Sequence, residues 1–284
     1  MLKPQIKTFL FLAILTVILL GLGQLIAGRA GLYFGFAFAL LLNFGTYWFS
    51  DKIVLAMYGA KPAPKQKYLS LHNDIESVCK TAGIPKPKVY IVPLKIANAF
   101  ATGRNPKHAA VAVTEGILDK LNREELKGVL AHEISHVKNR DILIATIAAT
   151  IAGVISYIAM MARYAAMFGG GDRDREGNAL GLVGLLIAAI VAPIAALLIQ
   201  LAISRTREYS ADESGAMLLK NGLPLANALL KLEESAKTNP LRKGNTATSH
   251  LFIVNPFSAQ GFVKLFMTHP PISERVARLR KLKF

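Results

Sequence analysis

Long apolar runs separate the polar parts of this chain. None of the runs contains a charged residue, and they extend from Phe9 to Ala27, from Leu32 to Ser50, from Ile142 to Ala162 and from Ala179 to Ile203. A helix needs about 20 apolar residues to cross a bilayer, so each run is long enough to span one. The pattern predicts a predominantly α-helical integral membrane protein with four candidate transmembrane helices.

The runs divide the chain into alternating hydrophobic and polar parts. We expect an N-terminal transmembrane hairpin over residues 1–50 and a second hydrophobic hairpin over residues 142–203. Residues 51–141 and 204–284 form the two parts of a domain outside the bilayer. The second hairpin can also fold back against this domain without crossing, because Pro193 and many small residues interrupt it.

Shorter periodic patterns predict an α+β domain with a small sheet. They indicate helices from Ser70 to Ala82 and from Leu225 to Ala236, and strands from Lys88 to Val92, Ala97 to Thr102 and Ala109 to Val113. The Gly103–Pro106 stretch reads as a turn between the last two strands, and Lys61–Pro64 as a linker. Ser273 is the expected N-cap of a final helix, after a loop from Asn239 to Gly261.

The motif Ala131-His132-Glu133-Ile134-Ser135-His136 carries the main candidate chemistry. Asn122 followed by Glu125 is typical of a capping box, and it predicts that the motif lies on a helix. His132 and His136 then share one helix face, where both imidazoles can reach a single metal ion. Glu133 lies close to the open position of that metal. This spacing is typical of a zinc protease helix.

A third metal ligand is available far downstream, in a segment from Ser204 to Asp212. Glu208 and Asp212 are four residues apart, so on a helix they share a face. Glu208 can complete the ligand set. Asp212 can accept a hydrogen bond from the free ring nitrogen of a ligand histidine, which fixes the tautomer of that histidine.

These motifs, in this order and around apolar runs, resemble the HtpX-type membrane zinc metalloproteases. The resemblance extends over nearly the whole chain, and this family belongs to the gluzincin group, with the CAAX prenyl protease among its relatives. Further matching stretches are Asn98–Gly103 before the histidine helix and Thr268–Pro271 with Arg275 near the C-terminus. The resemblance implies a zincin-like catalytic domain formed by residues 51–141 and 204–284, with one Zn²⁺ per chain.

The resemblance also implies roles for individual residues. Glu133 acts as general base, and His269 donates a hydrogen bond to the developing oxyanion, unless it is only a packed residue beside two prolines. The stretch Asn98-Ala99-Phe100-Ala101 is the expected edge strand that pairs with an extended substrate. An ordinary internal strand is the alternative. The implied activity is hydrolysis of peptide bonds in misfolded or damaged membrane proteins, as quality control under stress.

Charge distribution predicts the topology. The net charge is +16, but the basic residues flank apolar runs, which favours contact with an anionic lipid bilayer and argues against nucleic acid. Lys3 and Lys7 precede the first run, and a lysine cluster from Lys52 to Lys67 follows the second. We therefore expect a multi-pass protein of a prokaryotic plasma (inner) membrane, with its catalytic domain in the cytoplasm.

The ends of the apolar runs lie close in sequence to the candidate metal ligands. His136 precedes Ile142 by six residues, so the helical rise places the metal roughly 10 Å from the apolar boundary. The site should thus lie at the membrane surface. Cys79 is the single cysteine, which excludes an internal disulfide.

Two other functions remain open from the sequence. A dedicated processing protease with one membrane substrate would use the same residues. A membrane zinc-binding scaffold or transporter is the non-enzyme alternative, but a transporter should carry ionisable residues within its spans and a scaffold has no use for Glu133. The sequence specifies neither the cleavage preference, the oligomeric state nor the identity of the metal.

Overall fold

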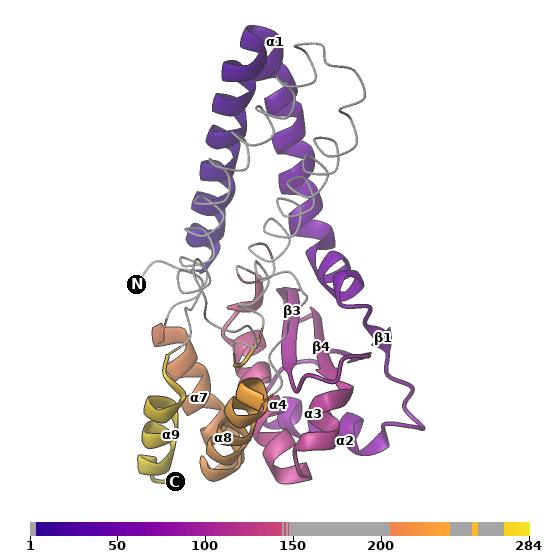
Figure 1. Ribbon diagram of the computed structural model, residues 1–284, viewed down its shortest axis with the longest axis vertical. Coiled ribbons are helices and arrows are strands. Elements are labelled where there is room, and N and C mark those ends of the chain that lie inside the picture. Colours follow the sequence, from indigo (N-terminus) through magenta and orange to yellow (C-terminus); the bar gives the residue numbers. More distant parts are fainter. Residues whose placement is uncertain (1–3, 144, 146, 148–204, 239–251, 255–269) are drawn as a thin grey trace.

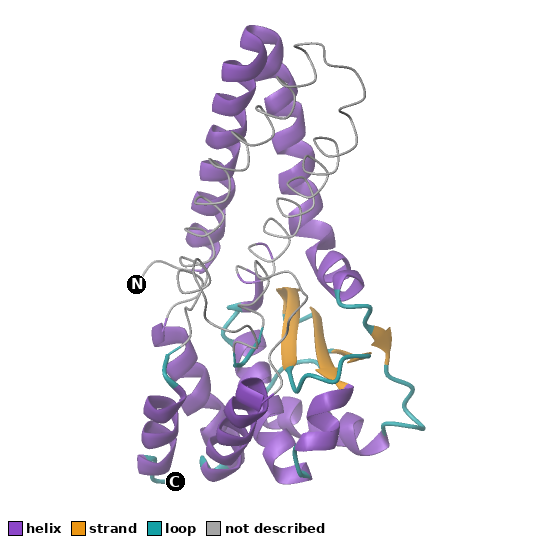
Figure 2. Cartoon of the chain, viewed as in Figure 1, coloured by secondary structure: helices purple, strands orange, loops and turns teal. Residues whose placement is uncertain are grey.

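The computed structural model describes residues 4–143, 145, 147, 205–238, 252–254 and 270–284 of the 284-residue chain. The third and fourth apolar runs, residues 163–178 between them and the Asn239–Gly261 loop fall wholly or largely outside this part, and so does His269. The described part consists of long helical arms above a smaller α+β domain (Figure 1). Figure 2 shows that all the strands lie in this domain.

The N-terminal hairpin is a single long element, α1 (Pro4–Met57), which reverses its direction (Figure 1). Gly28, near the middle of α1, has a φ of 55°, a left-handed conformation that suits glycine. The two arms are in contact where the Asn43 amide donates to the Thr16 hydroxyl at 2.8 Å, and they diverge toward the α+β domain (Figure 1). At Gly35 a side chain would meet the carbonyl oxygen of Leu19 at 2.6 Å, so glycine permits this close contact.

Within the described residues, one helical segment is long and apolar enough to cross a membrane. It is Gly28–Phe49, a stretch of 22 residues in the second arm of α1. Its large apolar side chains are mostly exposed, as expected of a surface that faces lipid. One of the four predicted spans thus has a candidate among the described residues, and the transmembrane hairpin over residues 1–50 stays a prediction.

A four-stranded mixed sheet forms the centre of the α+β domain, with strand order β1-β2-β4-β3. The strands are β1 (Lys61–Pro62), β2 (Lys88–Val92), β3 (Ala99–Asn105) and β4 (His108–Thr114). The prediction for β2 is confirmed to the residue. Among the described strands, β3 lies at an edge of this sheet, as predicted for the stretch that contains Ala99, Phe100 and Ala101, and its pairing with a substrate stays a prediction.

The turn between β3 and β4 lies later than the sequence suggested. β3 continues through Arg104 to Asn105, and the turn is at Pro106 and Lys107. Gly103 takes a φ of 129° at a bulge, which lets the strand continue where a turn was predicted. The Asn105 side chain then accepts the N–H of His108 at 3.0 Å and closes the turn.

The sheet is covered on both faces, and its side chains alternate accordingly. Val111 and Val113 point into the main core against helices α2 (Leu69–Ala82) and α4 (Arg123–Lys138). Phe100 points the other way and packs near Val54, at the end of α1. The C-terminal end of α1 is thus packed directly on the sheet that contains β3.

Local signals explain the helices of this domain. Asn122 accepts the N–H of Glu125 and Glu125 accepts the N–H of Asn122, so the predicted capping box begins α4. Gly83 ends α2 with a φ of 71°. The short helix α3 (Glu115–Lys120) begins at Thr114, whose side chain accepts from Ile117, and it was not predicted.

The C-terminal part adds α7 (Arg205–Leu219), α8 (Leu223–Thr238) and α9 (Ile272–Lys281). Helix α8 confirms the predicted amphipathic helix and extends it at both ends. The prediction that Ser273 is the N-cap of the last helix is wrong. Pro271 occupies that position, and its carbonyl accepts the N–H groups of Glu274 and Arg275 at 3.1 Å, so Ser273 lies inside the first turn.

Candidate active site

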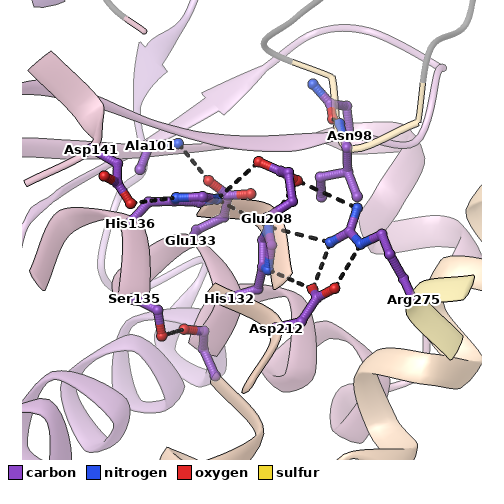
Figure 3. Close-up of polar contacts among 12 residues, drawn as sticks. Asn98, Ala101, His132, Glu133, Ser135, His136, Asp141, Glu208, Asp212 and Arg275 are labelled. Carbon is purple, nitrogen blue, oxygen red and sulfur yellow. Dashed lines mark hydrogen bonds and ion pairs between the residues drawn. The ribbon is translucent and has the colours of Figure 1, made fainter. Parts of the chain in front are cut away.

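Helix α4 presents the three residues of the histidine motif to one interior region. His132 and Glu133 are buried, and His136 is partly buried, between α4 and β3 (Figure 3). The two imidazoles are stacked edge to face, with ring centroids 4.7 Å apart. Their Nε2 atoms lie 3.2 Å apart, so both rings direct the same nitrogen to one place.

Helix α7 brings the downstream carboxylates to this place by packing very closely against α4. At Gly215 an added Cβ would meet the backbone nitrogen of His132 at 2.9 Å. Only a glycine permits this approach without displacing one of the helices. Glu208 and Asp212 lie on the same face of α7 as Gly215, and both are buried beside the histidines.

His132, His136 and Glu208 together form a cluster that could hold a metal ion, with one potential ligand atom from each within 4.8 Å of the others. The Nε2 atom of His136 is 3.5 Å from Oε1 of Glu208, and that of His132 is 3.9 Å from Oε2. Tetrahedral zinc with ordinary bond lengths places its ligand atoms about 3.4 Å apart. The three side chains therefore fit a zinc ion.

The buried ion pair of Asp212 and Arg275 lies on the Nδ1 side of the His132 ring. The Asp212 carboxylate lies 2.9 Å from Nδ1 of His132, and it also accepts two hydrogen bonds from Arg275, at 2.6 and 2.8 Å (Figure 3). Burial alone would raise the pKa of Asp212, but Arg275 outweighs this effect and lowers the pKa. Asp212 is therefore an anion, and it favours the His132 tautomer that leaves Nε2 free for a metal.

Arg275 connects both carboxylates of α7. Its side chain is 0% exposed, and besides the fork on Asp212 its Nη1 lies 3.5 Å from Oε2 of Glu208. These carboxylates raise the pKa of Arg275 against the effect of burial. Helix α9 thus supplies a buried positive charge that compensates the acidic ligand and the acidic partner of a ligand.

His136 has a carboxylate partner of its own at the end of α4. Its Nδ1 lies 3.4 Å from Oδ2 of Asp141, and the Oδ1 of Asp141 lies 4.0 Å from Nε of Arg207. Burial lowers the pKa of His136, but the contact with Asp141 and the nearby carboxylates of Glu208 and Glu133 outweigh burial and raise the pKa to about 9. Each histidine is therefore oriented through Nδ1 and has its Nε2 directed at the cluster.

Glu133 lies between this cluster and the sheet edge. One of its carboxylate oxygens accepts the backbone N–H of Ala101 at 2.9 Å (Figure 3). Burial raises the pKa of Glu133, and the two neighbouring histidines and the hydrogen bond from Ala101 reduce the effect without reversing it. A carboxylate with a raised pKa next to a metal cluster is suited to accept and return a proton.

The four residues expected at the substrate edge have different positions. Ala99 and Ala101 lie on β3 with their side chains in the main core, and Phe100 packs on the opposite face against Tyr58, with ring centroids 5.3 Å apart. Asn98 precedes the strand, and its side-chain oxygen accepts the N–H of Ile253 at 3.0 Å. All four side chains are buried, so a peptide could reach only the main chain here.

Sequence reasoning assigned no role to two residues of this site. Arg275 was noted only as part of a matching C-terminal stretch, and a single arginine on an amphipathic helix gives no sign that it is buried. Asp141 was read as the boundary of an apolar run. A useful signal was its position just after the helix that carries both histidines, within reach of the second one.

The arrangement is that of a hydrolytic metal site: three potential ligands, a buried carboxylate beside them and an edge strand alongside. Comparison with known protein families agrees, and the chain is a metalloendopeptidase. The sequence model of peptidase family M48 matches residues 65–283. The chain belongs to this family.

Similar proteins extend over nearly the full chain. The Protease HtpX homolog of Pyrococcus furiosus is 54% identical over 277 residues, which cover 98% of this chain and 95% of the relative. The Protease HtpX homolog of Desulfatibacillum aliphaticivorans is 54% identical over 275 residues, with coverage of 97% and 88%. The resemblance of the sequence motifs to the HtpX-type proteases is thereby confirmed.

A solved structure shares the fold. The crystal structure of S. mikatae Ste24p superposes with a TM-score of 0.50 at 18% sequence identity, and the match covers 97% of this chain and 64% of that chain. At this identity the likeness concerns the fold alone. With the apolar segment Gly28–Phe49, the comparisons support a membrane metalloprotease.

Proposed function

We propose that the chain is a zinc-dependent endopeptidase at the cytoplasmic membrane surface, which hydrolyses peptide bonds of misfolded or damaged membrane proteins. The observation that carries this proposal is the convergence of His132, His136 and Glu208 beside Glu133, next to the edge strand β3. The family relationship supports proteolysis. The substrate class and the side of the membrane are inferences from the position of the site.

In this mechanism His132, His136 and Glu208 hold the zinc ion, which when bound activates a water molecule and polarises the scissile carbonyl. Glu133 accepts a proton from the water and later delivers one to the leaving amine. Burial raises its pKa, which makes the carboxylate a stronger proton acceptor. The Ala101 N–H keeps the carboxylate pointing to the reaction position.

Asp212 and Arg275 act through the ligands. Asp212 holds the His132 ring through Nδ1, and Arg275 keeps Asp212 ionised and in place. Asp141 orients the ring of His136 through its Nδ1 atom, as Asp212 does for His132. The ligands are therefore preorganised, which reduces the cost of assembling the site around a metal.

The proposed substrate lies along β3 as an added strand. Main-chain groups of successive residues in an antiparallel pair alternate between the partner strand and the open side. Because the Ala101 N–H turns away from β4 and reaches Glu133, the main chain of Ala99 lies on the same open side. A peptide held there by main-chain bonds would have its carbonyl groups close to the base, without selection for particular side chains.

His269 is proposed, on family resemblance, to donate a hydrogen bond to the carbonyl oxygen during attack. The position of its neighbours supports the proposal. Pro270 and Pro271 directly precede α9, and α9 places Arg275 inside the site. We expect His269→Ala to lower kcat and to change KM less, since the interaction forms in the transition state.

Proteolysis by the purified full-length chain in proteoliposomes tests this function. The assay would compare an unfolded soluble protein, a destabilised membrane protein and its stable parent, each with the zinc-loaded enzyme and with the chelator-treated enzyme. The proposal predicts zinc-dependent cleavage of the destabilised membrane protein in preference to its stable parent. Cleavage of stable and destabilised forms at the same single bond would instead indicate a dedicated processing protease.

A further inference from the structure

The boundary between the apolar span and the polar domain carries a cluster of aromatic side chains. The candidate membrane-spanning segment ends at Phe49, and Asp51 and Lys52 are the first charged residues after it. Tyr47 and Trp48 pack edge to face at this point, with ring centroids 5.6 Å apart. Tryptophan and tyrosine at the end of a span typically lie at the level of the lipid headgroups.

The tip of the β3–β4 hairpin reaches this boundary. The guanidinium of Arg104, near the end of β3, lies 4.2 Å from the centre of the Trp48 ring, within the range of a cation–π interaction. Lys52 lies 5.4 Å from the centre of the Phe49 ring, and Lys107 is exposed at the turn of the hairpin. Arg104 and Lys52 thus contact aromatic side chains at the end of the candidate span, and Lys107 lies three residues after Arg104 at the hairpin turn.

The hairpin tip is held at this level by packing as well as by charge. Phe100, on the same strand, packs against Tyr58 just beyond the end of α1, with ring centroids 5.3 Å apart. Val54 at the end of α1 belongs to the same buried cluster. Figure 1 shows β3 rising beside the lower part of α1, with its C-terminal end toward the helical arms.

We propose that the β3–β4 tip is anchored at the membrane–water interface through Arg104 and Trp48, and that Arg104, Lys52 and Lys107 contact anionic lipid phosphates. Strand β3 would then begin at the headgroup layer. A substrate segment that leaves the bilayer could pair with β3 directly. The anchoring does not depend on catalysis, whereas the delivery of substrate rests on the proposed function.

The geometry places the base close to this entry point. Arg104 and Ala101 are three residues apart on one strand, so at the usual rise about 10 Å separate the anchor from the N–H that holds Glu133. The helical rise from His136 to Ile142, where the third apolar run begins, also corresponds to roughly 10 Å. A bound peptide would need only a few extended residues between the bilayer and the scissile bond.

Trp48 is the single tryptophan of the chain, so its fluorescence reports on the anchor directly. The experiment uses the full-length protein in phosphatidylcholine vesicles that contain phosphatidylglycerol, with brominated lipids that carry bromine at shallow or deep positions. We expect shallow bromine to quench Trp48 at least twofold more than deep bromine. Stronger quenching by deep bromine, or none by either, would overturn the anchor.

Variants separate the anchor from simple surface packing. Arg104→Ala should shift the Trp48 emission and reduce its response to phosphatidylglycerol, and Arg104→Lys should restore most of that response. Lys52→Gln with Lys107→Gln should lower the response further, whereas Lys120→Gln, an exposed lysine at the end of α3, should leave it unchanged. An unchanged response in Arg104→Ala, or an equal loss in Lys120→Gln, would contradict the lipid contact.

A kinetic comparison tests delivery of the substrate. Arg104→Ala should raise KM severalfold for a peptide tethered to the vesicle and leave KM for the free peptide within twofold. Equal changes for both peptides would refute delivery from the membrane. If the parent protein cleaves neither peptide while the quenching results hold, the anchor stands and the proposed protease function fails.

Discussion

Substitution of Gly215 with alanine tests whether the spacing of α4 and α7 determines the metal affinity. The new Cβ would lie 2.9 Å from the backbone nitrogen of His132 and 3.1 Å from the carbonyl carbon of Ala131. Both are backbone atoms, so no side-chain rotation can relieve the contact. We expect α7 to move away from α4 by about 0.5 Å, which restores an ordinary van der Waals separation.

A displacement of this size should change the stability of the protein little and the metal affinity of the site strongly. Overpacking costs about 1–3 kcal/mol, and replacing a helical glycine with alanine returns about 1 kcal/mol, so the net loss of stability should be about 0–2 kcal/mol. Glu208 and Asp212 move with α7, while His132 and His136 stay on α4. Functional groups must be held within about 0.5 Å, so zinc affinity should fall about 10- to 100-fold.

Gly128 provides the matched control. It lies on α4 but faces α8, where an added Cβ would meet the backbone nitrogen of Leu225 at 2.6 Å. Gly128→Ala should therefore destabilise the protein at least as much without moving a ligand. Zinc competition with a chelating dye measures affinity for both variants, and thermal unfolding of the metal-free forms measures stability. Parent-like zinc affinity in Gly215→Ala, or an equal loss of affinity in Gly128→Ala, would refute the reasoning.

Three further predictions follow from the site and the sequence. Glu208→Ala should abolish zinc binding and Asp212→Ala should weaken it about 10- to 100-fold, as measured by metal content after dialysis; parent-like binding in both would remove Glu208 from the ligand set. The folded-state pKa of His136 is raised to about 9, so its charged form stabilises the metal-free protein. This stabilisation is complete below about pH 6.5 and is lost as the pH rises through 9. The unfolding temperature of the metal-free parent should therefore fall over this range more than that of Asp141→Asn. On a Cys79→Ser background, Lys65→Cys and Lys237→Cys should be protected from an impermeant thiol reagent in intact cells, whereas Arg29→Cys should be labelled; the reverse pattern would place the catalytic domain outside.

Local sequence signals predicted the local structure of the site well. The Asn122–Glu125 pair fixed the beginning of α4, and spacing alone then placed His132 and His136 on one face. A strand such as Lys88–Val92 was also recognisable, because it combines β-branched and aromatic residues between turn signals. In each case the determining interactions lie within a few residues of the chain.

Interactions between segments that lie far apart in the sequence could not be predicted from local patterns. Arg275 meets Asp212 across 63 residues, and an amphipathic helix with several cations does not reveal which of them is buried. The pairing of Lys61–Pro62 with β2 was missed because two residues carry no periodicity. Ser273 was taken as the N-cap because its hydroxyl suits that position, but the restricted backbone of Pro271 begins the helix two residues earlier.

The central claim is that Glu133 is the general base of a zinc endopeptidase, and Glu133→Gln tests it most directly. The substitution keeps the shape of the side chain and leaves His132, His136 and Glu208 intact. Metal content and proteolysis should be measured on the same purified sample. The account predicts one zinc ion per chain, as in the parent, with proteolysis reduced by at least about 100-fold. Parent-like proteolysis by the zinc-loaded variant would contradict it.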